Sequence, residues 1–361
     1  MKRWIFRIIL FLIAILVIAF VWIWYLSPGT TMAIYDIKGK FKTGSIASLE
    51  KVILGGVEQW VLLRGEDKQK PVLLILHGGP GVAEMLMYRE YLSELEKHFV
   101  VVNWDQQGAG KSYNNKIPVE CMNVEHFVSN TIELTEWLKK RFNQNKIYLL
   151  GHSWGSILGI KAIQKQPESY CAYIGVGQFV NFIEGERISY DFALKTAKEK
   201  NIAQAVKELE NIGRPPYKND IKLVKTQIER KWITMFGANT YGKTGYSFLI
   251  PILLSGREYT ISEKMGFFMG INFSLNLIWS HLTNIDFFIQ AKELNVPVYF
   301  CAGRHDYTVP SILAERYFRE LKAPKKDWIW FENSAHNPHF EEPEKFVDYL
   351  INTVLKETYS R

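Results

Sequence analysis

Short apolar runs alternate with amphipathic stretches along most of this 361-residue chain. Mainly apolar runs at 72–76, 146–150, 296–302 and 327–331 are too short for most helices, and their composition is typical of strands buried in a parallel sheet. A helical pattern follows the second run and ends before Pro167. We therefore predict an α/β fold in which a mostly parallel sheet is flanked by helices.

A long, mostly helical stretch separates the strand expected near residues 172–176 from the strand that begins near Val296. We interpret residues 181–285 as a helical lid, inserted into a core that comprises residues 28–180 and 286–361. Six large apolar residues of the lid either line a substrate pocket or, more simply, belong to the core: Phe267, Phe268, Met269, Phe273, Leu275 and Trp279.

Residues 1–27 follow a different pattern, because no charged residue interrupts the segment from Ile8 to Leu26. A helix of this length reaches about 28 Å, which is close to the thickness of the hydrocarbon layer of a membrane. Lys2 and Arg3 precede it, which favours an N-terminus inside the cell. We predict a single-pass anchor in a bacterial cell membrane with the folded domain outside the cytoplasm. A cleaved signal peptide is the alternative, but no A-x-A cleavage site follows.

Composition adds few constraints. The formal net charge is +7 and the three cysteines suggest neither a disulfide framework nor a metal-ligand spacing. No motif for nucleic-acid binding accompanies the positive charge. We therefore expect no metal, no cofactor and no nucleic-acid partner.

The sequence Gly-His-Ser-Trp-Gly at 151–155 stands between a predicted strand and a predicted helix. This combination is typical of a nucleophile elbow, a sharp turn that exposes a serine hydroxyl at a helix N-terminus. The glycines two residues before and after the serine leave room for the turn. We predict Ser153 as a catalytic nucleophile.

A serine nucleophile needs a base, and a third group to orient that base. His336 follows the strand at 327–331 and Asp306 follows the one before it, so both belong to the carboxyl edge of the predicted sheet. The order serine, acid, histidine is a known hydrolase order. His339 competes for the role of base and Glu332 for that of acid. We prefer His336 and Asp306.

The sequence His-Gly-Gly-Pro-Gly at 77–81 follows the buried strand at 72–76. Such a loop brings backbone N–H groups close to a ligand, and Pro80 has no N–H to offer. We predict that the N–H groups of Gly79 and Trp154 form an oxyanion hole.

These motifs together resemble the α/β-hydrolases of the prolyl iminopeptidase-like group. The resemblance rests on residues 77–81, 104–112, 151–156 and 303–306, together with His336, and it extends over nearly everything outside the N-terminus. It implies the α/β-hydrolase fold, and a serine hydrolase that cleaves an amide or ester through an acyl-enzyme. It also implies an N-terminal proline, or a similar small residue, as the preferred acyl part.

The substrate is less well defined by the sequence. The family usually has Asp-Gln-Arg-Gly where this chain has Asp-Gln-Gln-Gly at 105–108, so Gln107 stands in place of a cation. Glu184 and Glu186 are candidates for binding the substrate α-ammonium, or are carboxylates favoured by a helix N-terminus. We predict an aminopeptidase acting on small-molecule or short-peptide substrates. A carboxylesterase or lipase-like hydrolase and a non-catalytic ligand-binding homologue are the alternatives.

Overall fold

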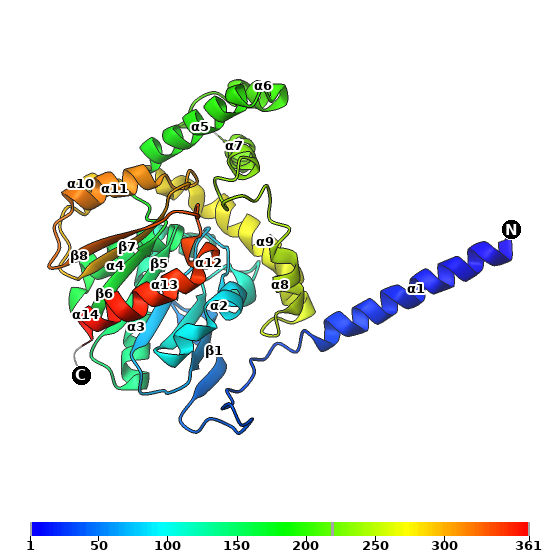
Figure 1. Cartoon of the computed structure of the whole chain (residues 1–361), viewed down its shortest axis with the longest axis horizontal. Helices are drawn as coiled ribbons and strands as arrows, with labels where there is room; N and C mark the ends of the chain where they lie inside the picture. Colours follow the sequence, from blue (N-terminus) through cyan, green and yellow to red (C-terminus); the bar gives the residue numbers. More distant parts are fainter. Residues whose placement is uncertain (1, 218–219, 360–361) are drawn as a thin grey trace.

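The computed structural model describes residues 2–217 and 220–359. Figure 1 shows a sheet with helices on both faces, a group of helices beyond one edge of this core, and a separate N-terminal helix. The eight strands lie in the order β1-β2-β4-β3-β5-β6-β7-β8. β2 is antiparallel to β1 and β4, and the other pairs are parallel. The predicted mostly parallel sheet and α/β-hydrolase fold are confirmed.

The strands match the apolar runs because the central ones are covered on both faces. Leu74 and Leu76 of β3 pack into one apolar cluster with α3 and α4, whereas Leu73 and Ile75 pack into another with α2 and α13. Complete burial of each such side chain stabilises the fold by about 1.5–3 kcal/mol. The strands are β1 Ile46–Leu54, β2 Val57–Gly65, β3 Val72–Leu76, β4 Val100–Asp105, β5 Ile147–His152, β6 Tyr170–Val176, β7 Val298–Gly303 and β8 Lys326–Phe331. The helices of the core are α2 Met85–Tyr91, α3 Val124–Phe142, α4 Trp154–Lys165, α10 Phe287–Gln290, α11 Ser311–Glu320, α12 Pro338–Glu341, α13 Pro343–Tyr349 and α14 Lys356–Thr358.

A helical insertion separates β6 from β7. It consists of α5 Phe182–Glu199, α6 Ala203–Ile212, α7 Val224–Met235, α8 Leu249–Ser255 and α9 Ile261–Ile278. Helices α5 to α7 have an apolar cluster of their own, which includes Tyr190, Leu209 and Trp232. This part of the insertion therefore has an interior separate from the two faces of the sheet.

The two ends of the helical insertion lie side by side. The Phe182 N–H donates to the Ile285 carbonyl (3.1 Å), and the Phe287 N–H donates to the Val180 carbonyl (2.9 Å). An isolated antiparallel bridge joins Asn181 to Asp286 between these bonds. The chain thus leaves the core and returns to it at one point.

Helix α1 (Lys2–Tyr25) projects away from the folded domain (Figure 1). Within its apolar window, Arg3–Tyr25, no residue is buried, and the segment is long and apolar enough to cross a membrane. Trp22, Trp24 and Tyr25 are exposed at the end nearest the domain. A helix with such a surface is not a core helix of this fold.

Candidate active site

Ser153 stands at the turn between β5 and α4, in a backbone conformation that few residues adopt. Its φ is 52° and its ψ is −117°, and its N–H donates to the Val176 carbonyl on the neighbouring strand (3.0 Å). Gly155 makes the turn possible, because a Cβ there would lie 2.0 Å from the Leu76 carbonyl oxygen. The strain is therefore held by close packing of the α4 N-terminus against the end of β3.

Asp306 and His336 meet at the same edge of the sheet. The His336 Nδ1 lies 2.8 Å from an Asp306 carboxylate oxygen, and both side chains are buried. The other Asp306 oxygen accepts the N–H groups of Thr308 (2.8 Å) and Val309 (2.9 Å). These bonds fix the orientation of the carboxylate toward the imidazole.

A glycine lets the two loops approach. A Cβ on Gly303 would lie 1.8 Å from the Ala335 carbonyl oxygen, so only glycine fits at the end of β7. The His336 ring packs beside Gly177, whose added Cβ would lie 3.1 Å from the ring. Gly177 directly follows Val176, the residue that binds the Ser153 backbone. The structure thus gathers Ser153, Asp306 and His336 around the ends of β5 to β8.

The loop that carries Gly79 is fixed from several sides. The His77 ring donates to the Gly78 carbonyl (2.8 Å) and accepts the Gln106 N–H (3.1 Å). The Gly78 N–H donates to Glu84 (3.1 Å). Trp154 is the first residue of α4, where backbone N–H groups have no partner within the helix. Its indole N–H donates to the Gln106 side chain (2.8 Å), which joins the α4 N-terminus to the Gly79 loop.

The competing candidates for base and acid lie elsewhere. Glu332 is exposed and forms a bidentate ion pair with Arg304 (2.7 and 2.8 Å). His339 is fully buried, and neither of its ring nitrogens has a hydrogen-bond partner among the described residues. Burial, together with the charges of its neighbours, lowers the pKa of His339 well below its usual value.

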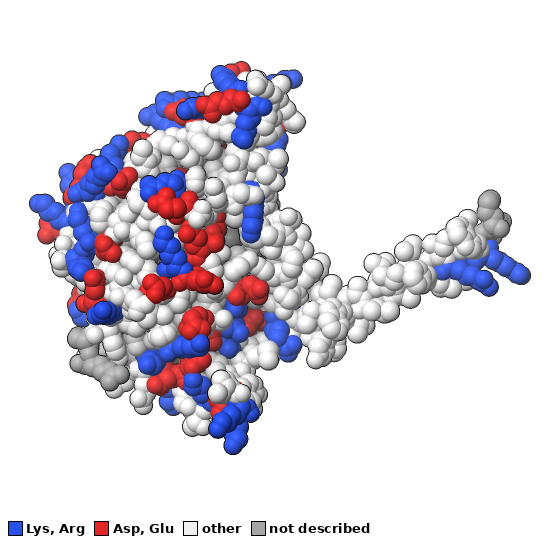
Figure 2. Space-filling view, in the orientation of Figure 1, with Lys and Arg blue, Asp and Glu red and all other residues white. Residues whose placement is uncertain are grey.

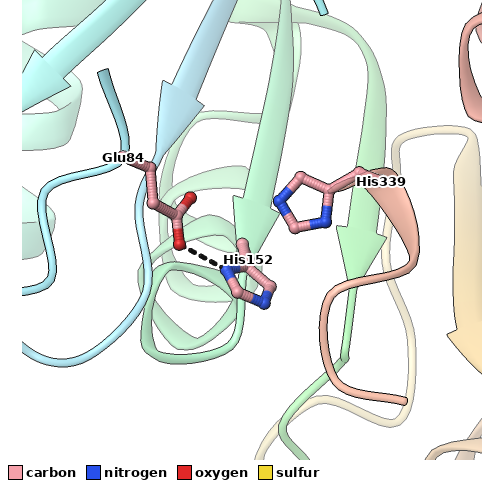
Figure 3. A group of neighbouring side chains, drawn as sticks. All are labelled: Glu84, His152 and His339. Carbon is pink, nitrogen blue, oxygen red and sulfur yellow. Dashed lines mark hydrogen bonds and ion pairs between the residues drawn. The ribbon is translucent and has the colours of Figure 1, made fainter. Parts of the chain in front are cut away.

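His339 belongs to a buried group with Glu84 and His152 (Figure 3). The His152 Nδ1 lies 2.5 Å from a Glu84 oxygen, and its Nε2 lies 3.0 Å from the His336 carbonyl. A carbonyl only accepts, so Nε2 is protonated, and the short contact to Glu84 favours a proton on Nδ1 as well. Burial opposes the charge on His152, but Glu84, the His336 carbonyl and Asp306 together outweigh burial and raise the pKa of His152.

Glu84, His152 and His339 are also the described residues best placed to hold a cation. One ligand atom from each lies within 4.8 Å of the others. The sequence suggested no such group, because the three residues are far apart along the chain. Glu84 and His152 lie 2.5 Å apart, which is a hydrogen-bond distance. A hydrogen-bonded ion pair between these two side chains therefore explains their arrangement without a bound cation.

Comparison with known proteins places this geometry in a family. A family model described as serine aminopeptidase, S33, matches residues 67–210. The probable aminopeptidase YbaC of Bacillus subtilis is 36% identical over 308 residues, which cover 85% of this chain and 96% of the relative. The chain belongs to the prolyl iminopeptidase-like α/β-hydrolases.

Other relatives agree with this assignment. The proline iminopeptidase of Clostridioides difficile is 28% identical over 82% of this chain and 94% of its own length. The crystal structure of proline iminopeptidase from Mycobacterium smegmatis superimposes with a TM-score of 0.59 and 17% identity, covering 86% of this chain and 98% of that one. At that identity the solved structure supports the fold alone. The family relationship makes this chain a hydrolytic enzyme.

The two predicted substrate-binding glutamates of this hydrolase have different surroundings. The Glu184 carboxylate faces solvent and binds both guanidinium nitrogens of Arg316 (2.7 and 2.8 Å). The structure therefore does not bring Glu184 to the site. Glu186, two residues on, is buried and lines a small cavity of about 10 Å³ with Gln178 and Thr308. Thr308 bonds the Asp306 carboxylate, so this cavity adjoins the candidate active site.

Glu186 belongs to an acidic group that sequence reasoning missed. It pairs with Arg230 of α7, whose guanidinium also lies 3.9 Å from Glu229. Glu229 is fully buried and accepts the Tyr217 hydroxyl (2.5 Å), but its other oxygen accepts no hydrogen bond from the described residues. Burial, and next the charge of Glu186, raise the pKa of Glu229 to about 8. The sequence feature that could have indicated this acidic group is a carboxylate on the apolar face of α7, three residues before Trp232.

Gln107 lies in the core with its amide turned toward the following loop. Its Nε2 donates to the Cys121 carbonyl (3.2 Å) and contacts the Met122 sulfur (3.4 Å). The side chain is buried, and its Oε1 has no partner within the described part of the chain. Gln107 thus packs against this loop, and its side-chain hydrogen bonds are to this loop and not to Glu186.

Proposed function

We propose that this protein is a membrane-anchored aminopeptidase in which Ser153, His336 and Asp306 form the catalytic triad. The observation that carries the proposal is the buried hydrogen bond between His336 and Asp306 beside the strained Ser153 turn. The bond from Nδ1 to Asp306 leaves Nε2 as the ring nitrogen that can accept a proton. Asp306 stabilises the imidazolium that results.

The reaction begins when His336 Nε2 takes the proton from the Ser153 hydroxyl. The serine oxygen attacks the carbon of the substrate carbonyl. The carbonyl oxygen becomes negatively charged in the tetrahedral intermediate that results. The N–H groups of Gly79 and Trp154 are proposed to bind that charge. Each such donor contributes about 3 kcal/mol of transition-state stabilisation.

Collapse of the intermediate breaks the bond to the leaving amine, which receives the proton from His336. The acyl group then remains on Ser153. His336 next takes a proton from water, whose oxygen attacks the acyl-enzyme, and the proton returns to Ser153 as the acid product leaves.

We propose Glu186 as the residue that receives the substrate α-ammonium, with Glu229 beside it. A buried carboxylate next to the cavity can replace the water shell that a cation loses on binding. Arg230 opposes this role, because it neutralises Glu186 while Glu229 carries a proton. The group becomes net negative only when Glu229 ionises, near its raised pKa of about 8.

The proposed anchor is α1. Its exposed apolar surface and the positive residues Arg3 and Arg7 support a single span with the N-terminus inside the cell and the hydrolase domain outside. Protease treatment of intact cells tests the orientation: we expect the domain to be digested. Survival of the domain until lysis would place it in the cytoplasm.

The triad is tested with a fluorophosphonate probe and prolyl or alanyl arylamides. We expect the probe to label Ser153, and Ser153→Ala to lose labelling and turnover without losing the fold. Arylamide turnover by Ser153→Ala at the rate of the unmodified protein would refute the mechanism.

Amine recognition is tested with the same arylamides after acetylation of the amine, which should sharply lower kcat/KM. Glu186→Gln should raise KM for the unblocked substrates. Glu184→Gln is the matched control, because the same change on the same helix removes only an exposed ion pair. Equal turnover of blocked and unblocked substrates would refute the aminopeptidase.

A carboxylesterase is the second candidate. Neutralisation of Glu186 by Arg230 favours it, since a neutral acyl chain requires no carboxylate. Acyl esters that react while both kinds of arylamide remain intact would establish this alternative.

A further inference from the structure

The segment that follows α1 is tied to the helical insertion. Lys264 of α9 donates from its ammonium group to the Ser27 hydroxyl (2.8 Å) and to the Leu254 carbonyl at the end of α8 (2.7 Å). The Thr30 N–H donates to the Arg257 carbonyl (3.1 Å) in the loop between α8 and α9. Lys264 and Ser27 are buried, so solvent does not compete for these bonds. The end of α1 is therefore fixed to α8 and α9.

Helix α9 buries two of its small residues, whereas several of its large apolar side chains are exposed. Gly270 and Ser274 are buried, and the Ser274 hydroxyl donates to the Gly108 carbonyl (3.1 Å). Met265, Phe268 and Met269 are 71%, 62% and 57% exposed. A helix that faces water has the opposite arrangement.

Helix α8 extends the same surface. Ile250 and Leu254 lie one turn apart and are 53% and 41% exposed. No Lys, Arg, Asp or Glu occurs from 244 to 256 or from 265 to 285. A group of exposed apolar side chains without charged neighbours in sequence is typical of an interaction site, whereas single exposed apolar residues are ordinary. We call Ile250, Leu254, Met265, Phe268 and Met269 the α8–α9 face.

We propose that the α8–α9 face rests in the membrane that α1 spans, at the level of the lipid headgroups. The inference depends on the proposed membrane anchor. Figure 1 shows α1 leaving the domain on the side where α8 and α9 lie, and Figure 2 shows few charged side chains where that side meets α1. The bonds from Ser27 and Thr30 to α8 and α9 keep the α8–α9 face beside the point where the chain enters the lipid.

The aromatic residues at the end of α1 indicate how deep the α8–α9 face lies in the membrane. Trp22, Trp24 and Tyr25 are the kind of side chains that lie at the interface between lipid and water. Only Leu26 separates them from Ser27, the residue that Lys264 binds. The α8–α9 face therefore lies next to the interfacial layer, where Phe, Met and Leu side chains are stabilised by leaving water.

Membrane docking of the α8–α9 face would also affect the loops beside the candidate active site. The inward side of α9 covers the loop at Gly108 and also the loop at Gly81, because a Cβ on Gly81 would lie 2.7 Å from Ser274. Lipid contact on the outward side would hold α9 against both loops. The bilayer thus becomes part of the surroundings that position the helical insertion over the site.

The test uses the full chain in phosphatidylcholine–phosphatidylglycerol vesicles, with Cys121 and Cys171 replaced by serine. A fluorescent probe is attached to a single new cysteine made by Met265→Cys. Matched probes are placed by Ile312→Cys, an exposed apolar position on α11 of the core, and by Leu16→Cys within α1. Far-UV circular dichroism and the melting temperature verify that each labelled variant is folded.

We expect lipid-borne quenchers to remove most of the emission at positions 16 and 265, and to leave position 312 unchanged. Quenching at position 16 without quenching at 265 would overturn the docking proposal and leave the anchor intact. No quenching at position 16 would overturn both. Equal quenching at 265 and 312 would show that lipid contact is not specific to the α8–α9 face, which also overturns the proposal.

Discussion

Replacing Glu84 by glutamine is expected to destabilise the protein strongly, although Glu84 does not belong to the proposed triad. Glu84 and His152 are about 5% and 4% exposed at the side chain, and their contact is 2.5 Å. Glu84→Gln leaves the charged His152 buried without its partner. Breaking a buried pair in this way costs about 3–5 kcal/mol of unfolding free energy, which lowers the melting temperature by on the order of 10 °C.

The effect of Glu84→Gln should depend on pH with a definite sign. Glu84 raises the pKa of His152 in the folded protein above its unfolded value. The stabilisation is therefore complete below the unfolded pKa of about 6.5, and it is lost as pH rises through the higher folded pKa. The difference in stability between the unmodified protein and Glu84→Gln should be largest near pH 6 and shrink toward pH 9.

Urea denaturation at several pH values, followed by tryptophan fluorescence, measures this difference. Glu94→Gln is the matched control, since its ion pair with Lys97 is about half exposed and is screened by solvent, so its loss should leave the stability nearly unchanged. The double variant Glu84→Gln, His152→Gln should lose less than the sum of the two single variants. A loss below about 1 kcal/mol for Glu84→Gln, or a loss that is constant with pH, would refute the buried ion pair.

Three further predictions concern the site. His336→Ala should lower kcat by about 10⁴-fold or more, whereas His339→Leu should retain turnover because neither ring nitrogen that it removes has a partner among the described residues. Steady-state kinetics with an arylamide distinguishes the two variants, and the opposite result would make His339 the base. Gly303→Ala should lower the melting temperature and kcat together, since its Cβ would meet the Ala335 carbonyl at 1.8 Å; an unchanged melting curve would contradict this packing. In the unmodified protein, KM for a prolyl arylamide should fall as pH rises toward 8, because Glu229 gains its charge with a pKa of about 8; a Glu229→Gln variant with the same profile would exclude this role.

The strands and the motif loops could be predicted from the sequence because burial on both faces leaves a simple signal. The apolar run at 72–76 coincides with β3, and the run expected at 327–331 is within one residue of β8. The loops at the ends of these strands then follow from the topology of a parallel sheet. That is why the sequence alone pairs Asp306 with His336 across the chain.

Side-chain environments in the helical insertion could not be predicted in the same way. Helix α9 is apolar on most sides, so its periodicity does not reveal which face is inward. Phe273 and Trp279 of the predicted stripe do pack against the core, but Phe268 and Met269 face outward. The prediction of a pocket or core was therefore wrong for these two residues, because Gly270 and Ser274 occupy the inward face.

The environments of the two predicted substrate-binding glutamates also could not be predicted from the sequence. Glu184 and Glu186 lie on the first turns of α5 and have equal claims by sequence, yet one is on the surface and the other is buried. A rotation of about 200° along the helix separates their directions. Glu229 belongs to a different helix, so its contact with Arg230 and Glu186 depends on how α5 and α7 pack.

The paired ends of the helical insertion have a consequence for how this enzyme can diversify. Because Phe182 and Phe287 bond across to Ile285 and Val180, the core is closed beneath the insertion by its own backbone. A replacement segment need only begin and end at these adjacent positions to leave every strand pairing undisturbed. The helical insertion can thus be exchanged as one segment, while Ser153, Asp306 and His336 stay on loops of the unaltered sheet. Such a segment must still replace the carbonyls of Ala238 and Asn239, which accept the N–H groups of Tyr307 and His336 beside the candidate active site.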